Sequence, residues 1–243
     1  MTPEMVIDFF DSSPGHKAVL LNSGSWGNYD PWPAMGAALY AGSPTFAAEI
    51  DRCAAALAPH VDWDLRACLT GGGPAGWVDR VDVIQPALWA MAVALAAQWR
   101  EAGVRPDVVI GHSQGELAAA TVAGILDRAD AARVVARRSA LLRAKSGAGA
   151  MLAVELDADG ARAALAGFED QIAIAAHNGP RSCVLSGDAD AIALLAELLD
   201  ADQVFARVVK VDYASHSHHM DDLAAPLVAA LAGLAPGAGH TPL

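Results

Sequence analysis

Apolar residues follow a helical spacing through most of the first 146 residues, interrupted by short continuous apolar runs. Runs of this length are typical of strands buried on both faces of a parallel sheet, which helices then cover. We therefore expect an α/β arrangement with strands at Lys17–Asn22 and Pro106–Gly111. The expected helices are Ala34–Leu57, Val83–Arg100, Glu116–Leu126 and Asp130–Lys145.

The pattern changes at Gly147, after which strands and helices alternate in the order β-α-β-β-α-β as far as residue 209. This is the order of ferredoxin-like domains. It predicts a large α/β subdomain from residues 1–146 and 210–243, with a ferredoxin-like small subdomain inserted at 147–209. The uncharged tail Leu223–Leu243 contains Pro226 and Pro236, and we interpret it as a small amphipathic helix followed by a loop.

One turn carries a recognisable chemical motif. Gly111-His-Ser-Gln-Gly115 fits G-x-S-x-G and lies between a predicted strand and a predicted helix, which is the setting of a nucleophile elbow. The large subdomain is therefore expected to be α/β-hydrolase-like. Ser113 would be the nucleophile, and the backbone N–H of Gln114 at the helix start would hold an oxyanion. A turn this sharp requires small flanking residues, a need that Gly111 and Gly115 meet.

Composition narrows the function classes. The formal net charge of −12 argues against a nucleic-acid surface, which needs a basic face. The apolar runs are too short to span a membrane, and the acidic N-terminus does not resemble a signal peptide. Three cysteines without C-x-x-C spacing indicate reduced core thiols and a cytoplasmic protein.

A serine nucleophile needs a base, and the chain has eight histidines. His216 is the preferred candidate because the run Ser215-His-Ser-His-His219 follows the last strand of the insert, where the chain re-enters the large subdomain. Clefts between subdomains commonly form ligand pockets. The same run also resembles a metal-ligand tract, but only Asp221 and Asp222 accompany it in the sequence, so no metal is expected.

Several stretches together resemble the malonyl-CoA–acyl carrier protein transacylases, and most closely the acyltransferase domains of modular polyketide synthases of the methylmalonyl type. The stretches are Arg80-Val-Asp-Val-Ile-Gln-Pro-Ala-Leu88, Gly111-His-Ser-Gln-Gly-Glu116, Val134–Ser139 with Arg138, Asn178-Gly-Pro-Arg-Ser182, Leu185-Ser-Gly-Asp188 and Val211-Asp-Tyr-Ala-Ser-His-Ser217. The resemblance implies that Ser113 and His216 are catalytic. It assigns the substrate pocket to Arg138, Gln85, His112, Tyr213, Ser215 and Asn178.

The resemblance implies acyl transfer from acyl-CoA, through an ester on Ser113, to the phosphopantetheine thiol of an acyl carrier protein. No bound cofactor is needed, and other polyketide synthase domains are possible partners, while nucleic acid and membranes are not expected. Arg138 would hold the free carboxylate of a malonyl-type substrate bidentately. Tyr213-Ala-Ser-His216 resembles the methylmalonyl type, because Ser215 leaves room for a methyl group where malonyl-specific domains have Phe; Gln114 and the Arg80–Gln85 stretch favour the same substrate.

The chain departs from the family in two places. Ser23 stands roughly where the family has an oxyanion-hole glutamine, and family members continue for tens of residues beyond this C-terminus, where a carbonyl orients the catalytic histidine. Two alternatives therefore stay open. One is a serine hydrolase, either an ester hydrolase or an acyl-CoA editing enzyme, and the other is a truncated, non-catalytic domain that binds a carrier protein or a partner chain.

Overall fold

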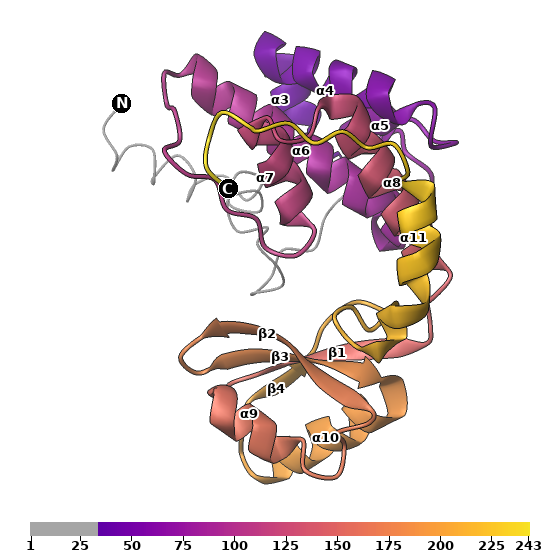
Figure 1. Ribbon diagram of the computed structural model, residues 1–243, viewed down its shortest axis with the longest axis vertical. Coiled ribbons are helices and arrows are strands. Elements are labelled where there is room, and N and C mark those ends of the chain that lie inside the picture. The colour runs from indigo at the N-terminus through magenta and orange to yellow at the C-terminus, as the bar shows by residue number, and fades with distance from the viewer. Residues whose placement is uncertain (1–33) are drawn as a thin grey trace. The chain divides into compact units, whose positions relative to one another are not determined.

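The computed structural model describes residues 34–243, and the chain forms two compact units (Figure 1). The first unit comprises Met1–Ala140 and Leu231–Leu243, and the second comprises Leu141–Ala230. The second unit contains the predicted insert 147–209 and extends beyond it on both sides. The expected strand at Lys17–Asn22 and the candidate residue Ser23 lie outside the described residues.

Helices packed around a long apolar helix make up the described part of the first unit. That helix, α6, is buried along most of its length, and α4 and α7 pack against it. The core combines large side chains such as Phe46, Trp77 and Trp89 with the alanines of α6. The elements are α3 (Ala37–Gly42), α4 (Pro44–Leu57), α5 (Leu65–Thr70), η1 (Trp77–Asp79), α6 (Val81–Glu101), α7 (Gly115–Ala123) and α8 (Arg128–Arg143), the last of which continues into the second unit.

The helix expected over Ala34–Leu57 is broken into two at Ser43. Ser43 has extended backbone and its Oγ accepts a hydrogen bond from the N–H of Phe46 at 3.1 Å, while Pro44 occupies the first helical position. A serine cap followed by proline starts a helix, because proline lacks the N–H that a first-turn residue leaves unpaired anyway. The Ser-Pro pair was therefore a readable signal for the break.

The expected strand at Pro106–Gly111 is not a strand in the structure, and the described part of the first unit contains none. Val109 donates its N–H to the carbonyl of Pro242 at 3.0 Å, but Ile110 is 88% exposed. A strand needs neighbouring chains to pair its backbone groups. Among the described residues, this segment has one backbone hydrogen bond to another segment, the bond to Pro242. The apolar run alone was therefore not enough to predict a strand.

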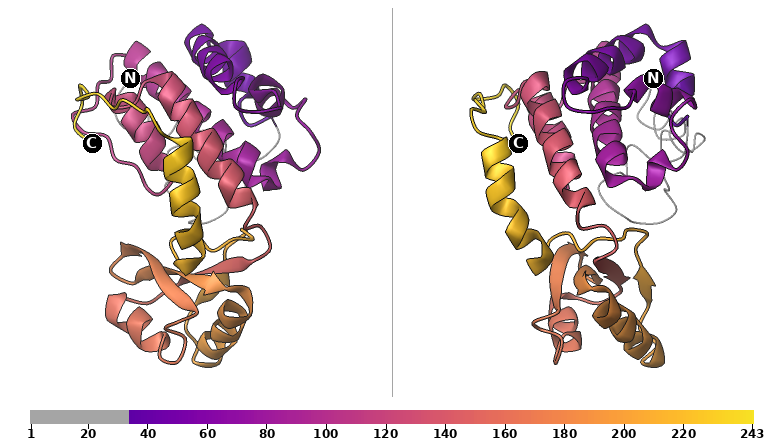
Figure 2. Two further views of the ribbon diagram at one scale, coloured as in Figure 1. Left: turned by 45° about the vertical axis from the view of Figure 1, so that its right-hand side comes forward. Right: turned by 90° about the vertical axis from the view of Figure 1, so that its right-hand side faces the viewer.

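The second unit holds one antiparallel sheet, in which the strands lie in the order β2 (Ile172–Gly179), β3 (Ser182–Asp188), β1 (Gly149–Val154) and β4 (Ala206–Val208). Helices α9 (Ala158–Ala164) and α10 (Ala189–Ala201) cover the same face of this sheet in Figures 1 and 2. This confirms the β-α-β-β-α-β order and the ferredoxin-like topology predicted from the sequence. Strand β4 is followed by η2 (His218–Leu223) and α11 (Ala224–Ala230).

Helix α11 is the short helix expected in the uncharged tail, and residues 231–243 follow it without further helix. Part of this tail pairs with the end of α7, since His240 and Gly237 donate their N–H groups to the carbonyls of Ala123 and Ile125 at 2.7 and 2.8 Å. Among the described helices, α6 is long and apolar enough to cross a bilayer, but 61% of its most apolar window is buried inside the protein, as in the core helix of a globular fold.

A buried carboxylate joins two helices of the first unit, α4 and α8. Glu49 of α4 is only 5% exposed, and its two oxygens accept from Arg52 and from Arg128 of α8. Burying a carboxylate is favourable only when it is paired and hydrogen-bonded. Glu49 therefore fixes α8 against α4 through Arg128.

We predict that Glu49→Ala lowers the free energy of unfolding of the first unit by about 1–3 kcal/mol, since it leaves Arg128 partly buried without its partner. The matched control is Asp51→Ala on the same helix, whose pair with Arg66 is nearly half exposed and should change stability by less than about 1 kcal/mol. All six tryptophans precede residue 100, so tryptophan fluorescence during urea unfolding reports this unit alone. Equal losses of unfolding free energy for Glu49→Ala and Asp51→Ala would contradict the stabilising role of the buried Glu49–Arg128 pair.

The three thiols should be unreactive in the native protein. Burial raises the pKa of Cys53 to about 12 and that of Cys68 to about 11, and it raises the pKa of Cys183 as well. Because the thiolate is the reactive form, a thiol reagent at neutral pH should modify all three slowly, and rapidly after denaturation. A fast reaction of any of the three thiols in the native protein would contradict its burial in the structure.

Candidate active site

The serine turn is fixed by a close approach of Gly111 to the helix that follows it. A Cβ placed on Gly111 would lie 2.2 Å from Cα and 2.3 Å from N of Glu116, a separation that no side chain tolerates. The turn is closed by Gly115 N–H donating to His112 O at 2.9 Å and by Glu116 N–H donating to Ser113 O at 3.1 Å. The predicted need for a small residue is therefore real at Gly111, whereas a Cβ on Gly115 meets no described atom within 4 Å.

This closure places Ser113 in a strained backbone conformation. Its φ is +51°, in the left-handed region that L-residues rarely adopt. Helix α7 begins two residues later, with Gln114 as its N-cap residue. The hydroxyl-bearing residue thus stands at a helix N-terminus, where N–H groups without intrahelical partners favour a developing negative charge.

A guanidinium and an amide from two other helices meet in the same unit. Nη1 of Arg138 on α8 donates to Oε1 of Gln85 on α6 at 2.7 Å. Gln85 is buried, at 6% exposure, within an otherwise apolar helix face, and Arg138 is half-buried. This bond restricts the orientation of the guanidinium, a planar group whose parallel N–H donors suit bidentate binding of a carboxylate.

The candidate base lies in the second unit, in a segment held against the start of β1. Gly147 donates its N–H to Asp212 O at 2.6 Å, and a Cβ on Gly149 would lie 2.6 Å from the Cβ of Ala214, so Ala214 packs directly on a glycine. His216 is exposed and has φ +62°. The described residues contain four non-glycine residues with positive φ, and Ser113 and His216 are two of them; such strain gathers at functional sites.

The remaining predicted residues are distributed over both units. His112 lies in the serine turn and Asn178 near the end of β2, while Tyr213 and the buried Ser215 precede His216. The structure brings Arg138 and Gln85 together. The roles proposed for all of these residues stay predictions, including the pairing of Ser113 with His216, which belong to different units.

Sequence reasoning missed one polar residue that the fold brings to the histidine run. Asp188, at the end of β3, accepts a hydrogen bond from Nε2 of His219 at 2.6 Å, and Nε2 of His218 lies 3.5 Å from the same oxygen. Thirty-one residues separate Asp188 from His219. Only the topology of the small sheet could reveal this contact.

Chemically, the first unit presents a hydroxyl on a strained turn, a helix N-terminus beside it, and an oriented guanidinium. Comparison with known proteins gives this arrangement its class. Residues 30–242 match the model of the acyl transferase domain family, so the chain belongs to that family.

Polyketide synthase GfsA of Streptomyces halstedii is 49% identical over 216 residues, which cover 89% of this chain and 3% of that synthase. The acyltransferase domain from module 8 of the salinomycin polyketide synthase superposes with a TM-score of 0.84 at 46% identity, covering 89% of this chain and 51% of that one. A type II polyketide synthase malonyl-transacylase, solved in complex with its acyl-carrier protein, superposes with a TM-score of 0.78 at 28% identity, over 89% of this chain and 71% of that one.

These likenesses establish the α/β acyltransferase fold for the chain. The chain spans only a few per cent of the curated synthase it matches and about half of the salinomycin domain.

We predict that Gly111→Ala lowers the free energy of unfolding of the first unit by at least about 1–3 kcal/mol, the usual range for overpacking, because the clash is with backbone that cannot rotate away. Gly115→Ala is the matched control. Gly115 lies at the start of α7, and a Cβ added there meets no described atom within 4 Å, so the substitution should be neutral or slightly stabilising. Fluorescence-monitored urea unfolding of both variants measures the difference, and a neutral Gly111→Ala would contradict the turn geometry.

Proposed function

We propose that this chain transfers a malonyl-type acyl group from acyl-CoA to the phosphopantetheine thiol of an acyl carrier protein, in polyketide assembly. The observation that carries the proposal is the serine turn. Ser113 has a strained backbone at the N-terminus of α7, in a turn whose close approach to Glu116 only a glycine at position 111 allows. Membership of the acyl transferase family supports it, as do the polyketide synthase relatives and the carrier-protein complex of the similar transacylase.

The reaction proceeds in two balanced halves. Ser113 Oγ attacks the thioester carbonyl while His216 accepts its proton, and the C–S bond then breaks as His216 returns that proton to the sulfur of CoA. The carrier-protein thiol next attacks the serine ester, gives its proton to His216, and displaces Ser113, which is reprotonated. The Gln114 N–H at the start of α7 stabilises both tetrahedral oxyanions.

Arg138 selects the acyl group. Its guanidinium binds the free carboxylate of a malonyl-type substrate, and the buried Gln85 amide holds it in the required orientation. This also explains how a chain of net charge −12 accepts an anionic substrate, since a fixed cation acts locally where the distant charges are screened.

Methylmalonyl-CoA is the proposed extender unit. Ser215 is buried in the segment Tyr213-Ala-Ser-His216, and a serine there occupies less space than the phenylalanine of malonyl-type domains. Accommodating one methyl group changes the transition-state binding free energy by about 1–3 kcal/mol. The chain should therefore prefer methylmalonyl-CoA over malonyl-CoA without excluding malonyl-CoA. His112, Tyr213 and Asn178 complete the proposed pocket.

Intact-protein mass spectrometry tests the proposal. Incubation with methylmalonyl-CoA should give one covalent adduct, which Ser113→Ala abolishes and which Ser146→Ala, at an exposed serine, leaves unchanged. Addition of holo acyl carrier protein should remove the adduct and acylate the carrier.

Two outcomes would overturn the proposal and favour the alternatives. An adduct that is lost to water and never reaches the carrier would favour a hydrolase. No adduct with any malonyl-type CoA, from a folded chain, would favour a non-catalytic domain.

A further inference from the structure

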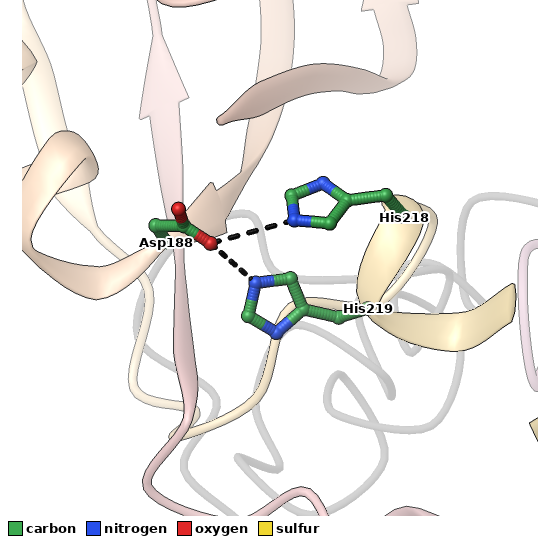
Figure 3. Close-up of side chains that lie close together, drawn as sticks. All are labelled: Asp188, His218 and His219. Carbon is green, nitrogen blue, oxygen red and sulfur yellow. Dashed lines mark hydrogen bonds and ion pairs between the residues drawn. The ribbon is translucent and has the colours of Figure 1, made fainter. Parts of the chain in front are cut away.

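Three side chains of types that can bind a metal ion converge in the second unit, outside the residues proposed for acyl transfer (Figure 3). Asp188 comes from the end of β3, and His218 and His219 come from the start of η2. Both imidazoles turn the same nitrogen, Nε2, toward one carboxylate oxygen, at 3.5 Å from His218 and 2.6 Å from His219. The three potential ligand atoms all lie within 4.8 Å of one another.

The position of Asp188 makes this convergence informative. Asp188 is the N-cap residue of α10, where an aspartate side chain ordinarily accepts a hydrogen bond from an N–H of the first turn. Its side chain makes no such bond. The carboxylate points instead to the two histidines, so this interaction replaces a local cap that usually contributes about 0.5–2 kcal/mol.

Asp222, one of the two acids that follow the histidines in the sequence, is engaged elsewhere. It binds Nζ of Lys145 at 2.6 Å, and this interaction lowers the pKa of the Asp222 carboxyl. The third ligand is therefore Asp188, which the sheet topology supplies and the sequence spacing did not indicate.

We propose that Asp188, His218 and His219 form a site for Zn²⁺. Two imidazole nitrogens and one carboxylate oxygen suit zinc and neighbouring transition metals, whereas magnesium and calcium prefer oxygen ligands alone. Three protein ligands leave a fourth position for water, as in open zinc sites. Tetrahedral ligation at about 2.0–2.2 Å requires ligand atoms roughly 3.3–3.6 Å apart. Binding of the ion would therefore break the 2.6 Å hydrogen bond between His219 and Asp188 and move the two groups slightly apart.

The burial of the three residues fits an accessible ion rather than a sealed one. The side chain of His219 is 13% exposed, whereas Asp188 and His218 are 44% and 48% exposed. His219 would anchor the site from the protein side, and His218 would close it from the solvent side. Occupation would join the start of η2 to the N-terminus of α10, both within the second unit.

Zinc titration of the chain, prepared without a histidine tag and dialysed against a chelator, tests the proposal. Isothermal titration calorimetry should show one equivalent bound, and Co²⁺ in its place should give the d–d absorption of a tetrahedral nitrogen and oxygen site. His218→Ala keeps the His219–Asp188 hydrogen bond yet removes a ligand, so zinc affinity should fall by at least about tenfold, as should the affinity of Asp188→Ala.

The matched control variants are His177→Ala and His240→Ala, whose imidazoles contact Cys183 and Thr241 instead. Both should bind zinc as the parent does. Circular dichroism verifies that each variant is folded, and hydrogen exchange over residues 218–223 should slow when zinc is added. Failure of the folded parent to bind zinc, or equal binding by the His218→Ala and parent chains, would overturn the proposal. Acyl transfer enters none of these readouts, so the result is independent of the proposed function.

Discussion

The contact between Gly111 and Glu116 is the constraint on which the serine turn depends. Only a residue without Cβ lets the chain pass so close to the first turn of α7. Within the turn closed in this way, Ser113 has φ +51° and stands at a helix N-terminus. Strain of this kind amounts to about 1–3 kcal/mol and persists only where the surroundings over-determine it. Here the surroundings are the apolar face of α7 and the core around α6, which contact each other directly.

The same core positions the cation. Gln85 is a polar residue on the buried face of α6, and leaving its amide unpaired there would be destabilising. Its bond from Arg138 satisfies the carbonyl oxygen of that amide and at the same time turns the guanidinium in one direction. In the proposed function this one hydrogen bond would serve substrate selection as well as the pairing of a buried amide. Glu49 secures α8, the helix that carries Arg138, through Arg128.

The parts of the fold that the sequence predicted well are those determined by local pattern. Helices α6 and α8 and the ferredoxin-like strand order follow from periodicity and turn residues, which act over a few residues. The break at Ser43 was readable but missed, since apolar spacing continues through it. The Pro106–Gly111 run failed as a strand because strand formation depends on distant partners. For the same reason Asp188 could not be foreseen beside His218 and His219, although Arg138 and Gln85 were both identified from the motifs that carry them.

We propose that Arg138, oriented by Gln85, makes this chain select an acyl group bearing a free carboxylate. Methylmalonyl-CoA and propionyl-CoA differ only in that carboxylate, so the ratio of their rates of Ser113 acylation isolates its recognition. We expect the parent chain to prefer methylmalonyl-CoA strongly and Arg138→Ala to abolish the preference while propionyl transfer survives. An unchanged ratio in the Arg138→Ala variant would show that Arg138 does not select the substrate.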